Sequence, residues 1–412
     1  MSKKLHLLSV ASICIEDFEK AKKGNDYMGD VFVIFKVVTN VQDFDNALRY
    51  GLRTSGVWHR YSEFDLLYQY LLHTYPSHII PPLPEKKLST SLWTKMTVDK
   101  FDGEYLEHRK IGLEKFLHRV ASHPTLHDDN IFKAFLMKGE EWKEVADSTD
   151  FRAKNEGFLK GMAASYQLKH CDPRFSELRT YAEELESRIN AVLKVTQNIA
   201  AKQRLAYNSY KDLAKTFSDW SAIEKSLNIP LQKIGHHLDN LEGAGNVLLL
   251  EEDVKFCENM REYANYAYSL KDFIRKYELL QYKIEVLEST IEAKKAGLFM
   301  LGKPEAGEDV VAVEPGKSNL TNMFKATPQQ KEARRSKLHQ ELSDAEEALG
   351  PAQYDLEQFV SEAELEIKRW KKDKFSSLKD ALRMYAKLQL QHSQQGAQCW
   401  EAVSAAVKPA AV

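Results

Sequence analysis

The stretch Trp58-His59-Arg60-Tyr61-Ser62-Glu63-Phe64 lies where a predicted strand region ends and a predicted helix begins. Valine, isoleucine and phenylalanine in 30–41 suit a half-buried sheet, and the apolar residues after the stretch follow helical spacing. A guanidinium fork fits a phosphate, an aromatic ring offers a flat surface to a sugar-like ring, and a hydroxyl near a helix start adds a donor. Arg60, Tyr61 and Ser62 therefore predict a recognition corner for a small phosphorylated ring. In the alternative interpretation these residues have a structural role: the arginine pairs with a glutamate, and the tyrosine is packed against its neighbours.

The segments around this corner predict a small domain of strands and helices in residues 1–140. Its strand-like runs come first and its segments with helical spacing follow. We expect strands at 5–16, 30–41 and 56–61, joined as a meander, and helices at 62–74, 104–121 and 130–136.

A proline-rich arm, Ile79-Ile80-Pro81-Pro82-Leu83-Pro84-Glu85-Lys86-Lys87, follows the first helix. We expect an extended path, because each proline fixes its own φ and restricts the residue before it. Such an arm can hold an ammonium group against a phosphate. A loop with solvated lysines is the alternative, and the residues alone leave open whether Lys86 or Lys87 makes the contact.

Beyond the arm, Leu92, Trp93 and Met96 lie among lysines. Large apolar side chains beside cations suit a loop that dips into a membrane, with the lysines at anionic head groups. Packing of Trp93 on the domain is the other interpretation.

The composition excludes several classes of protein. A formal net charge of −2 over 412 residues argues against a generally basic nucleic-acid-binding protein. Four widely separated cysteines form no CxxC pair, which predicts reduced thiols in place of a disulfide framework or a zinc site. No apolar run approaches the roughly 20 residues that span a bilayer. The chain also has no nucleophile elbow, phosphate-binding glycine loop or HExxH motif, so we expect neither an enzyme nor a metal or cofactor site.

The second half predicts long helices. After an amphipathic linker helix within 141–172, apolar residues recur every three or four positions over many turns, as in a coiled coil. We expect helices at 174–227, 231–295 and 328–403, bends at Gly243, Gly245 and Gly350-Pro351, and a flexible tip at 297–328. Helices of this length cannot bury their apolar faces alone, which predicts a bundle with a second copy.

The densest positive charge lies in the last of these helices, at Lys368, Arg369, Lys371 and Lys372. A basic run on a helix is usually a solvated face. At a curved dimer surface the same run would attract anionic lipid, at about 1 kcal/mol per residue.

The corner at 60–64, the proline arm and Arg109 on a later helix occur in the order and approximate spacing of a phox-homology (PX) domain, and nearly the whole chain resembles the PX-BAR sorting nexins. The resemblance implies binding of phosphatidylinositol 3-phosphate. By the same resemblance, Arg60 would pair with the 3-phosphate, Tyr61 would stack on the inositol ring, Ser62 would support the phosphate contact, Lys86 would meet the 1-phosphate, and Arg109 would bond the ring hydroxyls. His59 stands where these proteins often carry a second arginine, a change expected to weaken affinity or make it sensitive to pH.

The architecture implied is an α+β PX domain (a three-stranded antiparallel sheet with helices) in 1–140, the linker helix, and an all-α BAR domain of three long kinked helices in 173–405 that forms a dimeric crescent. The resemblance implies a cytoplasmic protein, peripheral on the cytosolic face of early or recycling endosome membranes, that senses or generates curvature in sorting, recycling and autophagy-related transport. The implied partners are phosphatidylinositol 3-phosphate membranes and another PX-BAR sorting nexin, as a homodimer or heterodimer, without nucleic acid. The alternative is a cytosolic coiled-coil scaffold whose PX-like domain binds proteins.

Overall fold

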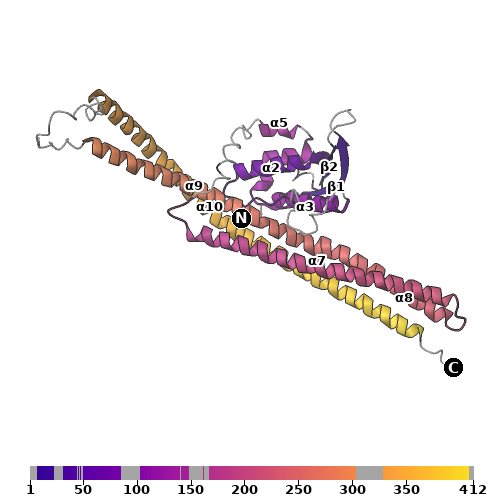
Figure 1. The fold of residues 1–412 in the computed structure, drawn as a ribbon. Coiled ribbons are helices and arrows are strands. Elements are labelled where there is room, and N and C mark those ends of the chain that lie inside the picture. Colours follow the sequence, from indigo (N-terminus) through magenta and orange to yellow (C-terminus); the bar gives the residue numbers. More distant parts are fainter. Residues whose placement is uncertain are drawn as a thin grey trace, which may run out of the picture.

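Figure 1 shows the fold of the computed structural model. The structure describes residues 7–22, 31–43, 45, 47, 50–84, 103–139, 141–147, 161, 167–302 and 328–407. A compact part with strands and short helices lies against the middle of a long bundle of helices (Figure 1). Each part has its own hydrophobic core. The fold class is therefore the expected one, a three-stranded sheet with helices followed by long helices.

The sheet is an antiparallel meander in the order β1-β2-β3. Its strands are β1 (Ala11–Lys22), β2 (Val31–Val41) and β3 (Ser55–Arg60). β3 leads directly into the first helix of the domain, so the corner predicted from the sequence lies at the end of a strand.

The first strand was predicted wrongly at 5–16. The structure has a 3-10 turn at Leu7–Ser9, and the strand continues to Lys22 because its second half pairs with the start of β2. A β-bulge between Ile15 and Asp17 separates the buried half of the strand from this polar half. Apolar residues alternate only in the buried half of the strand, so the sequence pattern did not predict the polar half.

Helices of the described chain cover the sheet and share one core with it. They are α2 (Tyr61–Thr74), α3 (Gly103–Ser122), α4 (Asn130–Met137) and α5 (Trp142–Asp147). The core includes Phe35 of β2, Phe64 of α2, Phe116 of α3 and Phe135 of α4, all almost fully buried.

The core of this domain continues past residue 140, where the domain was expected to end. Trp142 is fully buried, and its ring meets Phe135 edge-on, with centroids 5.1 Å apart. Ala146, one turn later, belongs to the same core. Helix α5 is therefore part of the first domain, because a buried indole fixes it there.

The long helices begin at Pro173. They are α7 (Pro173–Ser221), α8 (Asn228–Glu252), α9 (Glu258–Gly302) and α10 (Pro328–Ala406), with a π-helical turn at Asp253–Cys257 joining α8 to α9. Asp172 caps α7, since its carboxylate accepts a hydrogen bond from the backbone N–H of Arg174.

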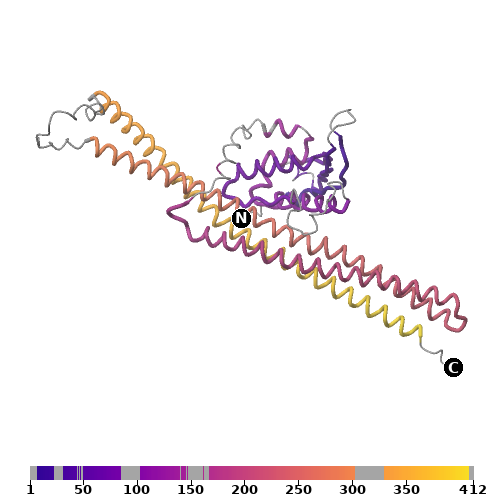
Figure 2. The backbone as a smooth tube through the Cα atoms, viewed as in Figure 1, coloured from indigo at the N-terminus to yellow at the C-terminus, as the bar shows by residue number. Residues whose placement is uncertain are grey.

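Figures 1 and 2 show how these helices lie along one another. Helix α8 returns along α7, and α9 continues past the first domain to form the opposite arm with the start of α10. The bundle core is rich in aromatic rings where α7, α9 and α10 meet. Phe175 stacks on Tyr277 with centroids 3.9 Å apart, and Phe359 packs beside them.

The predicted bend points in the second long segment are wrong. Helical structure runs without interruption through Gly243 and Gly245, and the irregularity is the π-helical turn at Asp253–Cys257. Gly245 instead permits a close helix contact, because a Cβ there would lie 2.5 Å from the ring of Tyr207 on α7. Pro351 lies within α10, which is assigned as one helix throughout.

Two predicted segments fall largely outside the described residues. Most of the linker helix in 141–172 lies there, and so do residues 303–327 of the tip. Helix α9 reaches Gly302, so the first residues assigned to the tip are helical. Within the ranges that the structure describes, no helix is both long and apolar enough to cross a membrane.

Gly245→Ala should destabilise the helical bundle, because the new methyl group overlaps the ring of Tyr207. Overpacking of this kind costs about 1–3 kcal/mol. Gly243→Ala is the matched control, since a Cβ there meets nothing within 4 Å and alanine favours the helix by up to about 1 kcal/mol. Urea unfolding of both variants should give midpoints shifted in opposite directions. Equal midpoints would contradict the assigned role of Gly245.

Candidate head-group site

The alternation of β3 sorts the residues of the corner onto two faces. Val57 and His59 point into the core, whereas Trp58 and Arg60 are partly exposed. The side chain of Arg60 is 37 % exposed, and its guanidinium carbon lies 4.5 Å from the ring centroid of Phe32 on β2. Arg60 is thus held flat against an aromatic ring at the surface, with its charge accessible.

His59 points away from the surface corner and into the core. It is fully buried, and its ring stacks on Phe135 at 4.0 Å. Nδ1 lies 2.8 Å from Oε2 of Glu63, and Nε2 lies 2.8 Å from the carbonyl oxygen of Phe135. Both ring nitrogens therefore lie within hydrogen-bond distance of an acceptor inside the core. His59 therefore acts inside the core, through Glu63.

Arg109 of α3 lies between two tyrosine rings. Its guanidinium carbon is 4.5 Å from the ring centroid of Tyr61 and 4.6 Å from that of Tyr105, and Nη2 donates a hydrogen bond to the Tyr105 hydroxyl. Burial lowers the pKa of Arg109, but an arginine remains charged at neutral pH. The structure therefore brings Tyr61 and Arg109 together, as the resemblance implied, but Arg109 covers one face of the ring.

The proline arm reaches the same place. The hydroxyl of Tyr61 donates a 2.7 Å hydrogen bond to the carbonyl oxygen of Pro84. A Cβ on Gly112 of α3 would lie only 2.7 Å from the Pro84 side chain, so glycine lets the arm pass close to α3, one turn after Arg109. The last described residue of the arm is thus fixed beside both Tyr61 and Arg109.

The remaining predicted site residues have mixed outcomes. Ser62 is exposed in the first turn of α2. Lys86, Leu92, Trp93 and Met96 lie outside the described residues, so their contacts stay predictions.

Sequence reasoning missed Tyr105 and Glu63 as parts of the site. The signal for Tyr105 is its spacing of four residues from Arg109, which places both side chains on one face of α3. Glu63 was quoted only as part of the motif, yet it contacts His59 and Arg60 and accepts a 2.6 Å hydrogen bond from Lys143. Lys143 had no sequence signal, since the contact joins α2 to α5.

The basic run of α10 is divided by the fold. Lys368, Lys371 and Lys372 are exposed, as a membrane-facing surface requires. Arg369 points instead toward the first domain and donates to Glu366 and to Asp373, the latter at 2.7 Å. Helical geometry separates them, because the residue next to an exposed position turns by about 100°.

Helix α3 is clamped to α9 by a row of polar contacts. His108 lies 2.9 Å from Glu258, Lys115 donates to Asn259 at 3.0 Å, and Arg119 makes two hydrogen bonds to Glu262. These α3 residues share one stripe, whereas Arg109 lies on a neighbouring face. The helix that carries Arg109 is therefore fixed to the bundle by its other side.

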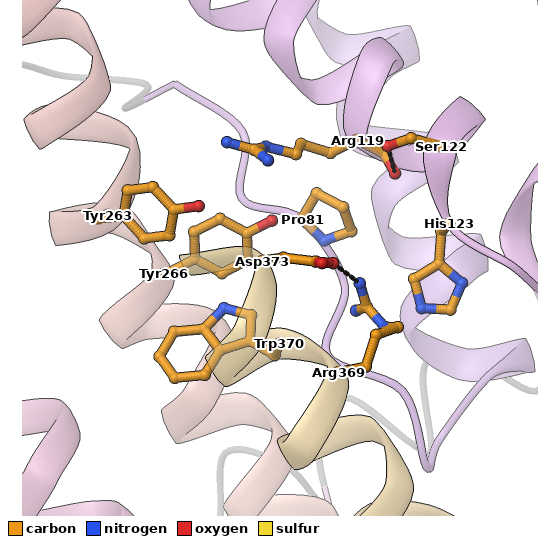
Figure 3. Close-up of a pocket in the computed structure, with 9 residues that line it drawn as sticks. All are labelled: Pro81, Arg119, Ser122, His123, Tyr263, Tyr266, Arg369, Trp370 and Asp373. Atoms are coloured by element: carbon orange, nitrogen blue, oxygen red, sulfur yellow. Dashed lines mark hydrogen bonds and ion pairs between the residues drawn. The ribbon is translucent and has the colours of Figure 1, made fainter. Parts of the chain in front are cut away.

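Figure 3 shows a pocket in this interdomain seam, between Pro81, Arg119, Ser122 and His123 of the first domain and residues of α9 and α10. Those residues are Tyr263, Tyr266, Arg369, Trp370 and Asp373. The cavity is about 20 Å³, which is room for about one water molecule.

The charges around this pocket are already paired. Arg119 binds Glu262, and Arg369 binds Glu366 and Asp373. Burial alone would raise the pKa of Glu366, but hydrogen bonds from Arg369 and His123 outweigh it and lower the pKa to about 2. The pocket is thus a small gap in an ionic interface and does not present an unbalanced charge to an anion.

Comparison with known proteins agrees with this geometry. Residues 49–138 match the family model described as PX domain. Over 395 residues the chain is 35% identical to sorting nexin-4 of Mus musculus, covering 95% of this chain and 86% of that protein. Sorting nexin-4 of Homo sapiens is 36% identical over 348 residues, covering 84% and 76%. A solved structure described as the SNX-BAR Mvp1 tetramer superposes with a TM-score of 0.66 at 16% identity, covering 95% of this chain and 99% of that one.

The sheet, the Arg60, Tyr61 and Arg109 corner and the long helices define a PX protein with a BAR-type helical half. The chain belongs to the sorting nexin family and is similar to sorting nexin-4. Sorting nexins are membrane-trafficking proteins and not enzymes. The PX domain implies binding to phosphoinositide membranes.

The α3 to α9 clamp should loosen as the pH rises. The hydrogen bond to Glu258 and the nearby Asp253 raise the pKa of His108 above 6.5. A raised histidine pKa contributes stability that is complete below pH 6.5 and is lost as the pH passes through the folded-state value. Hydrogen exchange in α9 should therefore show wild type more protected than His108→Gln below pH 6.5, and the difference should vanish at higher pH.

Comparison with the variant at each pH is needed because Lys276 acts in the opposite direction. Burial in the same interface lowers the pKa of Lys276 to about 7, so its charged form is disfavoured in the folded protein. That contribution is common to both proteins and cancels in the difference. A difference that stays constant across the pH range would contradict the role given to His108.

Proposed function

We propose that the chain is a peripheral membrane protein that binds phosphatidylinositol 3-phosphate through its PX domain and dimerises through its long helices. It works in endosomal sorting and recycling and in autophagy-related transport, on the cytosolic face of early or recycling endosomes, where the dimer senses or generates curvature. The observation that carries the proposal is the convergence of Arg60, Tyr61, Arg109 and the proline arm at one surface corner.

The chemistry of the corner supports a phosphorylated ring as ligand. Arg60 offers an accessible guanidinium that suits the 3-phosphate, and Ser62 adds an exposed hydroxyl at a helix start. Arg109 lies against the rings of Tyr61 and Tyr105, and its guanidinium donors suit the hydroxyls of an inositol. Lys86, two residues after the fixed Pro84, would reach the 1-phosphate.

Dimerisation is supported by apolar side chains that the single chain leaves exposed. They occur on several of the long helices and include Leu205, Leu250, Leu365, Phe375 and Leu390, each more than half exposed. Burial of large apolar side chains away from water is favourable, so we infer that a second copy of the chain covers them. Two copies joined there would carry two head-group pockets, which raises affinity for a membrane through multivalency.

Arg60→Ala should weaken binding to liposomes containing phosphatidylinositol 3-phosphate, because it removes the guanidinium that is expected to meet the phosphate. A charge-assisted pair is worth about 1.5–3 kcal/mol, or roughly a tenfold to hundredfold loss. Arg53→Ala, an exposed arginine of the same domain, should bind as wild type does. Binding is measured by co-sedimentation with liposomes that each contain one of the phosphoinositides. If the wild-type protein sediments with none of these liposomes, the result favours the protein-binding scaffold.

Charge reversal of Lys368, Lys371 and Lys372 together should reduce binding to anionic liposomes and tubulation of their membranes. We expect a loss of about 1 kcal/mol per lysine in membrane binding, with soluble head-group binding unchanged, since these residues lie on α10 and not in the PX corner.

The matched control reverses Lys194, Lys202 and Lys215, which are exposed on α7 and make the same change in net charge. If tubulation fell equally in both triple variants, the loss would come from the change in net charge. That outcome would contradict a specific membrane-binding surface on α10.

A further inference from the structure

Glu63 lies among three basic side chains, those of Lys143, His59 and Arg60. Its Oε1 accepts a 2.6 Å hydrogen bond from Nζ of Lys143, and its Oε2 lies 2.8 Å from Nδ1 of His59. The Nε of Arg60 is farther away, 3.6 Å from Oε1. The carboxylate is therefore bound mainly by the lysine and the histidine, and only loosely by the arginine.

Glu63 is ionised in this arrangement. Burial alone would raise its pKa, but the hydrogen bonds from His59 and Lys143 outweigh burial and lower it. A nearly buried carboxylate needs a cation, because an unpaired buried charge is costly. If Lys143 were absent, Oε1 would have the Arg60 guanidinium as its cation within 4 Å among the described residues.

We propose that Lys143 is a positioning residue for phosphate recognition: by neutralising Glu63, it leaves the guanidinium of Arg60 available to the phosphate of a 3-phosphoinositide head group. This inference rests on the proposed function of the corner. Without the lysine, the Arg60 guanidinium leaves the ring of Phe32 and closes the 3.6 Å gap to Glu63. The carboxylate then neutralises its charge, which is no longer available to a phosphate.

The position of Lys143 is set by the core of the domain. It follows Trp142, whose buried ring fixes α5 against Phe135. The residues that match the PX family model end at 138, so the ammonium group comes from a helix beyond that match. The pocket is thus completed by a segment that the recognisable PX motif does not contain.

Binding of full-length protein to soluble dibutanoyl phosphatidylinositol 3-phosphate, measured by calorimetry, tests the proposal. The soluble lipid removes the attraction of a charged membrane surface. Lys143→Met should weaken affinity about tenfold, the lower range for a lost charge-assisted contact, and Lys143→Arg should restore it by keeping a cation on Glu63. Lys133→Met is the matched control, because it also removes a lysine paired to a carboxylate, Asp128, in the same domain. It should bind as wild type does.

A second variant separates positioning from folding. In Glu63→Gln/Lys143→Met the buried charge and its cation are both absent, so the neutral amide no longer attracts Arg60. This double variant should bind within about threefold of wild type, whereas Lys143→Met alone does not. Thermal unfolding of each protein confirms that the measured material is folded.

The outcomes distinguish this proposal from the proposed function. If Arg60→Ala loses binding while Lys143→Met binds as tightly as wild type, the role of Lys143 is wrong and the head-group site stands. If Glu63→Gln fails to restore binding to the folded double variant, Lys143 does not act through Glu63. If wild type itself does not bind the soluble lipid, the proposed function fails first.

Discussion

The ionic contact between α3 and α9 is the interaction on which the rest of the structure depends. It joins a domain with its own sheet and core to a bundle that could otherwise pack alone. Arg119 and Glu262 form its centre, with two hydrogen bonds between partly buried groups. Breaking a buried pair leaves an uncompensated charge, which costs about 3–5 kcal/mol, so the contact fixes the domain in one orientation.

This clamp has a consequence for the head-group corner. Helix α3 carries Arg109 on one face and His108, Lys115 and Arg119 on another. The same rigid element therefore belongs both to the proposed head-group corner and to the interface with the bundle. A rotation of α3 would move Arg109 and the residues that contact α9 together, because an α-helix turns as one rigid element.

Within the corner, aromatic rings and a carboxylate set the positions of two arginine side chains. Arg109 is held between Tyr61 and Tyr105, and Arg60 lies on Phe32 above Glu63. Stacking orients a guanidinium without neutralising it, whereas a carboxylate neutralises it. The aromatic side chains that orient the two arginines come from β2, α2 and α3.

The sequence by itself determined the elements and most of the corner. Helical periodicity gave α2, α3 and α4 to within one residue and the ends of the long helices to within seven. The motif around Arg60, together with the proline arm and Arg109, identified the family. Local patterns succeed there because each is set by neighbours along the chain. Tertiary structure alone decided that His59 turns inward, that Arg369 leaves the basic surface and that Lys143 pairs with Glu63. These outcomes depend on which face meets another element, and contacts between α2 and α5 or between α3 and α9 leave no periodic signal in the sequence.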